Sequence, residues 1–230
     1  MPESLEVVTI DGPSGVGKST ISRRVAAGLG FTYLDTGAMY RAVALKCRMA
    51  GIDVTDEGAV AEILPALDLQ LLPARSEGEE ARVMLDGVEV SDRIRTPEIS
   101  MLASAVSALR PVRTRLTRMQ QVMGARGKIV AEGRDTGTVV FPGAAWKIYL
   151  DATSEERARR RVRQLKERGE EVDAEEILAQ IVRRDRDDSE RTIAPLRAAP
   201  DAVHIDSTGL SADEVVARVL AVVHQHNTAG

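Results

Sequence analysis

The sequence is poor in cysteine, in aromatic residues and in long hydrophobic runs. Its one cysteine, Cys47, has no second cysteine with which to form a disulfide, and this favours a reducing compartment such as the cytoplasm. No apolar run approaches the ~20 residues that a membrane-spanning helix requires. The first residues are acidic and lead directly into a hydrophobic strand, so they do not resemble a signal peptide. We therefore expect a cytoplasmic protein that does not span a membrane.

The sequence also lacks an excess of positive charge. It contains 31 lysines and arginines against 35 aspartates and glutamates, a net charge of −4. This balance argues against a general nucleic-acid-binding protein but leaves room for a local basic patch. Aromatic residues make up 3% of the 230 residues and hydrophobic residues 43%. The core is therefore expected to consist mainly of Val, Leu, Ala and Ile, in one α/β domain with room for a small insert.

One stretch near the N-terminus carries the strongest functional pattern. It matches G-x-x-x-x-G-K-[ST], the phosphate-binding P-loop. The β-branched residues 7–10 before it predict a buried strand, and the hydrophobic spacing after it predicts a helix that ends at Gly30. This order disfavours the alternative, a glycine-rich turn that binds nothing. The predicted nucleotide-binding residues are Gly12, Pro13, Ser14, Gly15, Val16, Gly17, Lys18, Ser19 and Thr20.

The residue types in this loop fit ATP and Mg²⁺. Gly12, Gly15 and Gly17 permit backbone conformations that other residues rarely adopt, and they let the backbone approach a polyphosphate. Unpaired N–H groups and the helix dipole at the start of the following helix favour an anion. Lys18 is expected to reach the outer phosphates, and the Ser19 hydroxyl is expected to bind Mg²⁺.

Strands and helices alternate along most of the chain. This alternation predicts a P-loop NTPase-type parallel sheet that is flanked by helices and joined by right-handed crossovers. The expected strands after the P-loop are residues 31–35, 128–131, 147–150 and 202–206.

A different pattern interrupts the alternation. Residues 81–85 and 88–90 flank Asp86-Gly87, which is a strong signal for a two-residue hairpin turn. The sequence thus predicts a small antiparallel sheet inserted into the parallel α/β fold.

Several polar residues follow the expected strands and are candidates for a site. Thr36 could be only an N-cap and Tyr40 only a packed aromatic, whereas Arg41 is as plausible a ligand as it is a solvated side chain. Arg134 and Asp135 follow a strand at the edge where ligands bind in open parallel sheets. The alternative for these two is an ion pair that closes a turn.

Two arginine-rich helices joined by a short polar loop are expected between residues 154 and 191. RNA binding is one alternative, but the acidic neighbours, the absence of interleaved aromatic residues and the negative net charge disfavour it. The pattern is typical of a mobile lid over ATP. Such a lid would bring guanidinium groups to the transferring phosphoryl group and exclude water.

Four further segments form a recognisable set: residues 10–15, 34–41, 133–142 and 184–191, with Ala194-Pro195-Leu196 behind the last. Together they resemble the bacterial-type cytidylate kinases, which belong to the nucleoside monophosphate kinases. The resemblance covers essentially the whole chain. It implies an enzyme of pyrimidine metabolism that uses ATP to convert CMP and dCMP to their diphosphates by direct in-line transfer. Nothing in the sequence requires more than a monomer, and the charge balance and the lack of long apolar runs predict no nucleic-acid or membrane partner.

The resemblance also implies roles for single residues. Ser104, Arg113 and Asp135 are implied to read cytosine. The chemistry agrees, because a carboxylate can accept from the cytosine amino group, whereas a hydroxyl and a guanidinium can donate to its O2 and N3. The position of Thr36 is often Ser in the family, and both residues carry a hydroxyl. The other implied substrate-binding residues are Tyr40, Arg41, Arg134, Arg184, Asp188 and Arg191, and the implied catalytic residues are Lys18, Arg134, Arg184 and Arg191.

The resemblance divides the single expected domain into three parts. The core comprises residues 5–67, 96–156 and 192–226. The nucleoside-monophosphate-binding β insert comprises about 68–95, and the helical lid about 157–191.

Three other functions stay open from the sequence. Another small P-loop kinase would act on a different nucleotide or metabolite and would not read cytosine. A nucleotide-dependent switch protein predicts a guanine-reading N-K-x-D segment, which the sequence lacks. A nucleic-acid-binding module would be retained on phosphocellulose and released at moderate salt.

Overall fold

The computed structural model describes residues 5–75, 79–167 and 169–227. The chain forms two compact units. Met1–Tyr33 and Gly124–Gly230 belong to the first unit, and Leu34–Met123 form the second. The P-loop therefore lies in the first unit, and the hairpin lies in the second.

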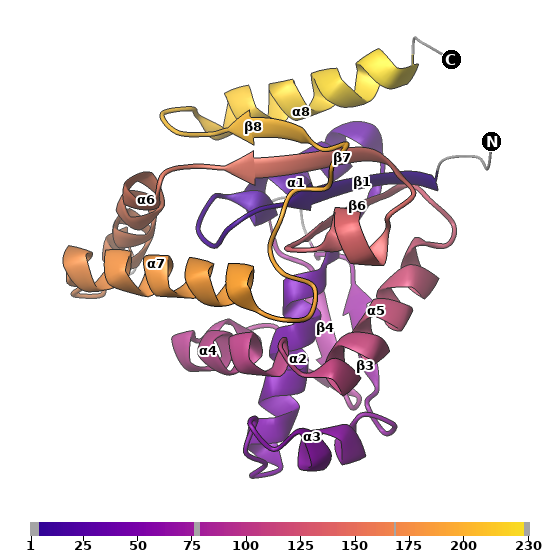
Figure 1. The fold of residues 1–230 in the computed structure, drawn as a ribbon, viewed down its shortest axis with the longest axis vertical. Helices are drawn as coiled ribbons and strands as arrows, with labels where there is room; N and C mark the ends of the chain where they lie inside the picture. Colours follow the sequence, from indigo (N-terminus) through magenta and orange to yellow (C-terminus); the bar gives the residue numbers. More distant parts are fainter. Residues whose placement is uncertain (1–4, 76–78, 168, 228–230) are drawn as a thin grey trace. The chain divides into compact units, whose positions relative to one another are not determined.

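The first unit is built on a five-stranded sheet, which confirms the predicted α/β class (Figure 1). The strand order is β2-β6-β1-β7-β8, and the β1–β6, β1–β7 and β7–β8 pairs are parallel. In this register Asp11, the last residue of β1, lies opposite Gly133 of β6 and Tyr149 of β7. The strands are β1 Leu5–Asp11, β2 Thr32–Asp35, β6 Ile129–Gly133, β7 Ala144–Asp151 and β8 Val203–Asp206, and the boundary between the units falls within β2.

Helices complete the first unit. The predicted first helix is confirmed, since α1 ends where Gly30 adopts a left-handed conformation and donates its N–H to Ala26 and Ala27. The helices α6 and α7 lie side by side (Figure 1). Among the residues that the structure describes, no helix is both long and apolar enough to cross a membrane. The helices are α1 Lys18–Leu29, α6 Ser154–Glu167, α7 Ala174–Glu190 and α8 Ala212–Asn227, and η2 Thr136–Val140 is a π-helix.

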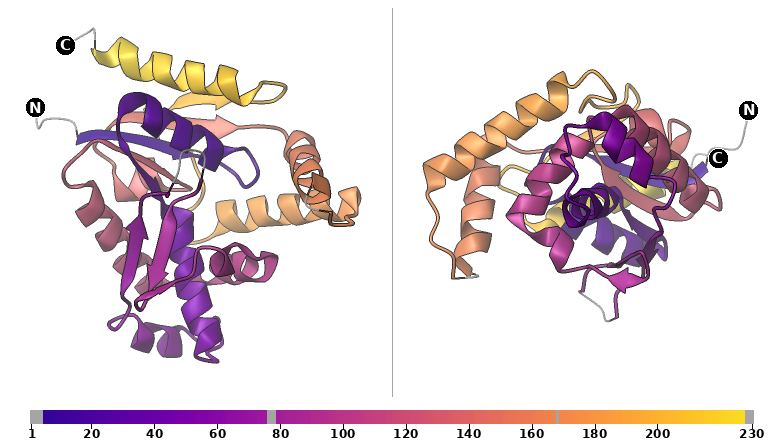
Figure 2. Two further views of the ribbon diagram at one scale, coloured as in Figure 1. Left: turned by 180° about the vertical axis from the view of Figure 1, so that it is seen from behind. Right: turned by 90° about the horizontal axis from the view of Figure 1, so that it is seen from below.

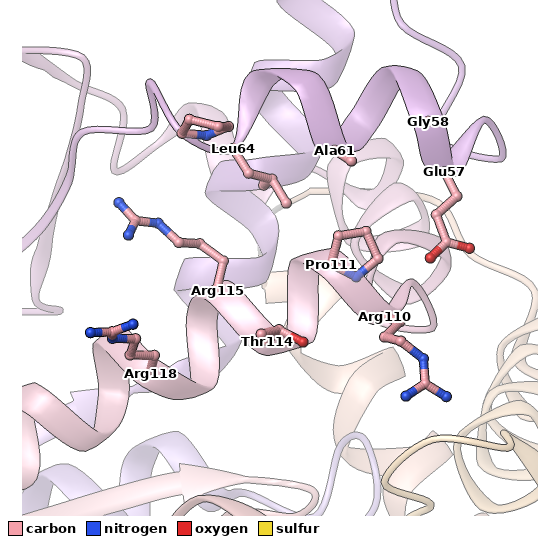
Figure 3. Close-up of a pocket in the computed structure, with 10 residues that line it drawn as sticks. Glu57, Gly58, Ala61, Leu64, Arg110, Pro111, Thr114, Arg115 and Arg118 are labelled. Carbon is pink, nitrogen blue, oxygen red and sulfur yellow. The ribbon is translucent and has the colours of Figure 1, made fainter.

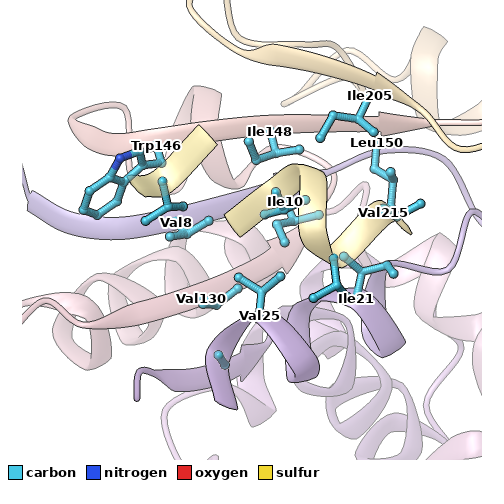
Figure 4. Close-up of a cluster of buried hydrophobic side chains, with 14 of the residues drawn as sticks. Val8, Ile10, Ile21, Val25, Val130, Trp146, Ile148, Leu150, Ile205 and Val215 are labelled. Carbon is cyan, nitrogen blue, oxygen red and sulfur yellow. The ribbon is translucent and has the colours of Figure 1, made fainter. Parts of the chain in front are cut away.

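The core of the first unit lies between the sheet and the helices α1 and α8 (Figure 4). Ile10 and Leu150 come from adjacent strands, and both are fully buried. They pack with Val25 of α1 and Val215 of α8 in one cluster. Full burial of each such side chain contributes about 1.5–3 kcal/mol to the stability of the fold. This packing therefore holds β1, which leads into the P-loop, and the neighbouring strand β7 in place.

The second unit contains a three-stranded antiparallel sheet in the order β3-β4-β5. The predicted hairpin is confirmed: Asp86 and Gly87 join β4 to β5 with φ angles of 51° and 79°, as a type I′ turn requires. The left view of Figure 2, seen from behind, shows β3 beside β4. The elements are α2 Thr36–Met49, α3 Glu57–Ile63, β3 Leu69–Leu72, β4 Arg82–Leu85, β5 Val88–Glu89, η1 Arg93–Arg95, α4 Pro97–Val106 and α5 Arg110–Gly124.

Two helix caps differ from the expectation. Asp35, not Thr36, caps α2, because its side chain accepts a hydrogen bond from the N–H of Ala38. Thr153 accepts from the N–H of Glu156 and so caps α6, whereas Ser154, where the first of the two arginine-rich helices was expected to begin, is already helical. Both caps follow the rule that the capping side chain bonds to the N–H three residues on.

Candidate active site

The P-loop connects β1 to α1 through three glycines with positive φ angles. Gly12, Gly15 and Gly17 have φ angles of 154°, 76° and 98°. A Cβ atom on Gly12 would lie 2.0 Å from the carbonyl oxygen of Leu150, so no other residue fits there. The first N–H groups of α1 follow directly, and they are available to an anion as at any helix N-terminus.

Lys18 lies folded against this loop. Its ammonium group donates a hydrogen bond of 2.7 Å to the carbonyl oxygen of Pro13, and the residue is buried. Burial lowers the pKa of Lys18 well below its usual value, the charge of Arg134 lowers it further, and Glu132 acts in the opposite direction. A bound polyanion would therefore stabilise the charged ammonium.

Oxygen atoms suited to Mg²⁺ meet at the start of α1. The Ser19 hydroxyl donates to Oε1 of Glu132 at 2.8 Å, and the Tyr33 hydroxyl donates to the same oxygen at 2.8 Å. Hydroxyl and carboxylate oxygens are the hard ligands that Mg²⁺ prefers, and this ion usually takes few protein ligands beside phosphates and water. The part of the chain that the structure describes contains no group of three His, Cys, Asp or Glu residues that could hold a metal. The residues present thus fit a magnesium ion that is held jointly by protein and nucleotide.

Two arginines of α6 support the P-loop from outside. Arg157 donates to the carbonyl of Ser14 at 3.1 Å and pairs with Asp185 of α7 at 2.7 Å. Arg160 donates to the carbonyl of Val16 at 3.2 Å. The sequence placed these arginines only in a charged helix, because nothing local shows which carbonyls they reach.

A turn after β6 presents Arg134 and Asp135. Both oxygens of the buried Asp11 carboxylate accept hydrogen bonds from the next two residues, Thr136 and Gly137. Burial raises the pKa of Asp11, although these hydrogen bonds act in the opposite direction. The end of β1 therefore contacts both the P-loop and this turn.

Arg134, Asp135, Asp188 and Arg191 form what we call the arginine–aspartate cluster. Arg134 pairs with Asp188 at 2.8 Å, and Arg191 lies 3.5 Å from Asp135 and 3.9 Å from Asp188. Burial would raise the pKa of Asp188, but the charges of Arg134, Arg184 and Arg191 outweigh it and lower that pKa. The structure thus brings together four residues that were predicted from the sequence to belong to the site. A fifth, Arg184, lies close enough to influence both Asp188 and Lys18.

The second unit holds the other sequence-proposed residues. Arg41 pairs with Asp35 at 2.9 Å, a partner that the sequence did not identify. The guanidinium of Arg113 lies 5.6 Å from the ring centroid of Tyr40, which is within the range of a cation–π contact. Thr36 is buried at the start of α2.

Ser107 links two of the residues that were implied to read cytosine. Arg113 donates to the carbonyl of Ser107 at 3.1 Å, and the Ser107 hydroxyl donates to the carbonyl of Ser104 at 2.7 Å. The end of α4 and the start of α5 therefore fix Ser104 and Arg113 with respect to each other.

A separate groove of about 750 Å³ lies between α3 and α5 (Figure 3). Pro111, Thr114 and Arg118 of α5 line it, whereas Arg113 is buried on another side of the same helix. The groove is lined by none of the residues that the sequence proposed for the site.

Comparisons with known proteins identify close relatives. A family model described as Cytidylate kinase matches residues 8–225. A protein named Cytidylate kinase from Geobacter sp. (strain M21) is 51% identical over 91% of this chain and 89% of its own length. Another of that name, from Geobacter sulfurreducens, is 48% identical over 97% of this chain and 94% of its own length. The crystal structure of an uncharacterized protein from Eubacterium ventriosum shares the fold, with a TM-score of 0.53 at 9% identity over 97% of this chain and 99% of that one.

Proposed function

This chain belongs to the cytidylate kinase family and is an ATP-dependent kinase of CMP and dCMP. We propose which of its residues carry out the reaction. The observation that carries the proposal is the placement of Lys18. Its buried ammonium lies at the P-loop under the influence of Arg134 and Arg184. Positive charge is thus concentrated where the phosphoryl group would pass.

The P-loop binds the phosphates of ATP. Its N–H groups and Lys18 hold the outer phosphates, and Ser19 with Glu132 would hold a magnesium ion. The chemistry that this ion supplies when bound is neutralisation of charge on the phosphates. Arg157 and Arg160 keep the loop carbonyls in place through the hydrogen bonds described above.

Cytosine is recognised by three side chains. Asp135 accepts a hydrogen bond from the amino group at C4, which uracil lacks. Ser104 and Arg113 donate to O2 and N3. A site that pairs these groups rejects a nucleotide that would leave the carboxylate opposite a carbonyl oxygen.

The phosphate of CMP is held by arginines. Arg41, Arg134 and Arg191 bind its oxygens, while Arg184 contacts the transferring phosphoryl group and Asp188 a ribose hydroxyl. Thr36 and Tyr40 complete the substrate-binding set. Each of these three arginines forms an ion pair with an aspartate. These ion pairs keep the arginine side chains ordered before the substrate binds.

Transfer proceeds in line, without a covalent intermediate. The attacking oxygen of CMP is already an anion and needs no strong general base. Lys18 and the arginines offset the charge that spreads over the transferred group. We also propose that residues 157–191 close over ATP as a lid, and that residues 68–95 belong to the nucleotide-binding region.

The test is ADP production from ATP and Mg²⁺ with CMP, dCMP, UMP, AMP, GMP and shikimate offered separately. Strong turnover on CMP and dCMP alone is expected. Arg113→Met should then lower the preference for CMP over UMP. An unchanged preference in this variant would contradict the role of Arg113, and turnover on another acceptor would contradict all three cytosine contacts.

Location and assembly are further parts of the proposal. The single, buried Cys47 supports a reducing compartment, and we propose a cytoplasmic monomer that binds no nucleic acid or membrane. Light scattering of the purified enzyme should give the mass of one chain. A mass of two chains would contradict the monomer.

A further inference from the structure

One buried carboxylate holds the turn that carries Arg134 and Asp135. Asp11 is 4% exposed. Its Oδ1 accepts from the N–H of Thr136 at 2.9 Å and from the Thr136 hydroxyl at 2.7 Å, and its Oδ2 accepts from the N–H of Gly137 at 2.8 Å. Both oxygens are therefore used on the two residues that follow Asp135.

The backbone of the same residue fixes the other side of the turn. Asp11 pairs with Gly133, the last residue of β6, in the parallel sheet. Arg134 and Asp135 thus lie between two points that are both tied to Asp11. With two residues between these points, the turn has little freedom to move unless one of them is released.

The turn also packs tightly on β1. A Cβ atom on Gly137 would lie 2.8 Å from the hydroxyl of Thr9 and 3.4 Å from Oδ2 of Asp11. Contacts below 3.0 Å leave no room for a side chain. The position of the turn is therefore defined by packing as well as by hydrogen bonds, and Asp11 supplies all the side-chain hydrogen bonds that join β1 to it among the described residues.

We propose that Asp11 is a positioning residue for cytosine selection, which sets the place of Asp135 through Thr136 and Gly137 without touching CMP. This inference rests on the proposed role of Asp135 as the acceptor for the cytosine amino group. Asp11, which directly precedes the ATP-binding P-loop, would thus influence the selection of cytosine in the second substrate, CMP.

The experiment measures kcat/KM for CMP and for UMP at saturating ATP. Asp11→Asn keeps the size of the side chain but replaces one acceptor oxygen by an amide donor, so one N–H or hydroxyl of the turn loses its partner. The preference for CMP over UMP should fall about tenfold, while KM for ATP changes less than about twofold. Thr136→Val removes one of the three donors and should give a smaller fall in the same direction.

Thr9→Val is the matched control. Thr9 is buried on the same strand beside the same turn, and its hydroxyl has no hydrogen-bond partner among the described residues. Valine has nearly the same shape, so the preference should not change. A fall in this control equal to that in Asp11→Asn would show a general effect of β1 and overturn the proposal.

A double variant with Asp135→Asn completes the test. If Asp11 acts through Asp135, its replacement should add little once Asp135 is replaced. An unchanged preference in Asp11→Asn beside a lowered one in Asp135→Asn overturns this inference alone. An unchanged preference in Asp135→Asn overturns the proposed role of Asp135, and this inference with it.

Two remaining outcomes are also decisive. Equal loss of activity on CMP and UMP would show a structural role only and overturn the proposal. If Asp11→Asn does not fold, Thr136→Val decides, and an unchanged preference in that variant counts against Asp11.

Discussion

The P-loop and the arginine–aspartate cluster lie in the same unit but depend on different physics. The P-loop takes its shape from backbone angles that glycine allows, within a few consecutive residues. The cluster joins Arg134 to Asp188, which are 54 residues apart in the sequence, and charge holds it together. One added Cβ atom should therefore disrupt the P-loop, whereas the stability that the arginine–aspartate cluster contributes should depend on pH.

The largest effect is expected from Lys18→Met. Methionine has a similar length and suits a buried position, so the fold should persist. The loss of the charge beside the outer phosphates should lower kcat about 10³-fold or more. Steady-state assays with CMP measure this loss, and circular dichroism checks the fold. Retained activity in a folded variant would contradict the P-loop assignment.

Gly12→Ala tests the dependence of the loop on its backbone. The new Cβ would lie 2.0 Å from the carbonyl of Leu150, at a φ angle of 154°. The free energy of unfolding should fall by about 3 kcal/mol or more, as measured by urea denaturation.

Gly209→Ala is the control for the backbone angle alone. Gly209 has a φ angle of 72° and no atom within 4 Å of the added Cβ, so its replacement should cost about 1–2 kcal/mol. Equal losses in the two variants would mean that the close approach to Leu150 contributes nothing.

This contrast also explains how much could be predicted from sequence. The strand–loop–helix order around the P-loop, the end of α1 at Gly30 and the Asp86-Gly87 hairpin were confirmed, because each depends on residues next to one another. Glu132 was missed as the partner of Ser19, since their contact follows from the β1–β6 pairing and not from spacing.

Two short elements were missed for related reasons. The π-helix η2 begins with Thr136, whose N–H is bonded by Asp11 from 125 residues away. Helix α3 has seven residues, too few for a clear hydrophobic period. The family resemblance implied a role for Asp188 toward the substrate, but the pairing of Asp188 with Arg134 could not be predicted from the sequence. That role and the other residue roles stay predictions until variants are measured.

Asp188→Asn tests the dependence of the cluster on charge. The native pKa of Asp188 lies below its usual value of 3.8, so the carboxylate stabilises the fold above that pH. Its contribution is lost as the pH falls through the lower native pKa. The variant should be about 2 kcal/mol less stable at pH 7.

The difference between Asp188→Asn and the unmodified enzyme should shrink below about pH 4. Urea denaturation at pH 7, 5, 4 and 3 measures it. A gap that stays constant down to pH 3 would show that the cluster depends on shape and not on charge.

The smallest effect is expected from replacing Arg160, where a charged side chain contacts a loop whose shape depends on its backbone. This arginine donates to the carbonyl of Val16 in the P-loop at 3.2 Å and to the carbonyl of Ser207 at 2.6 Å, so a charged side chain supports a backbone-defined loop. Arg160→Gln should raise KM for ATP about threefold with little change in KM for CMP. Arg163→Gln is the matched control, because Arg163 is exposed on the same helix and its replacement should leave both constants unchanged. If KM for ATP does not differ between the two variants, the backbone alone holds the P-loop.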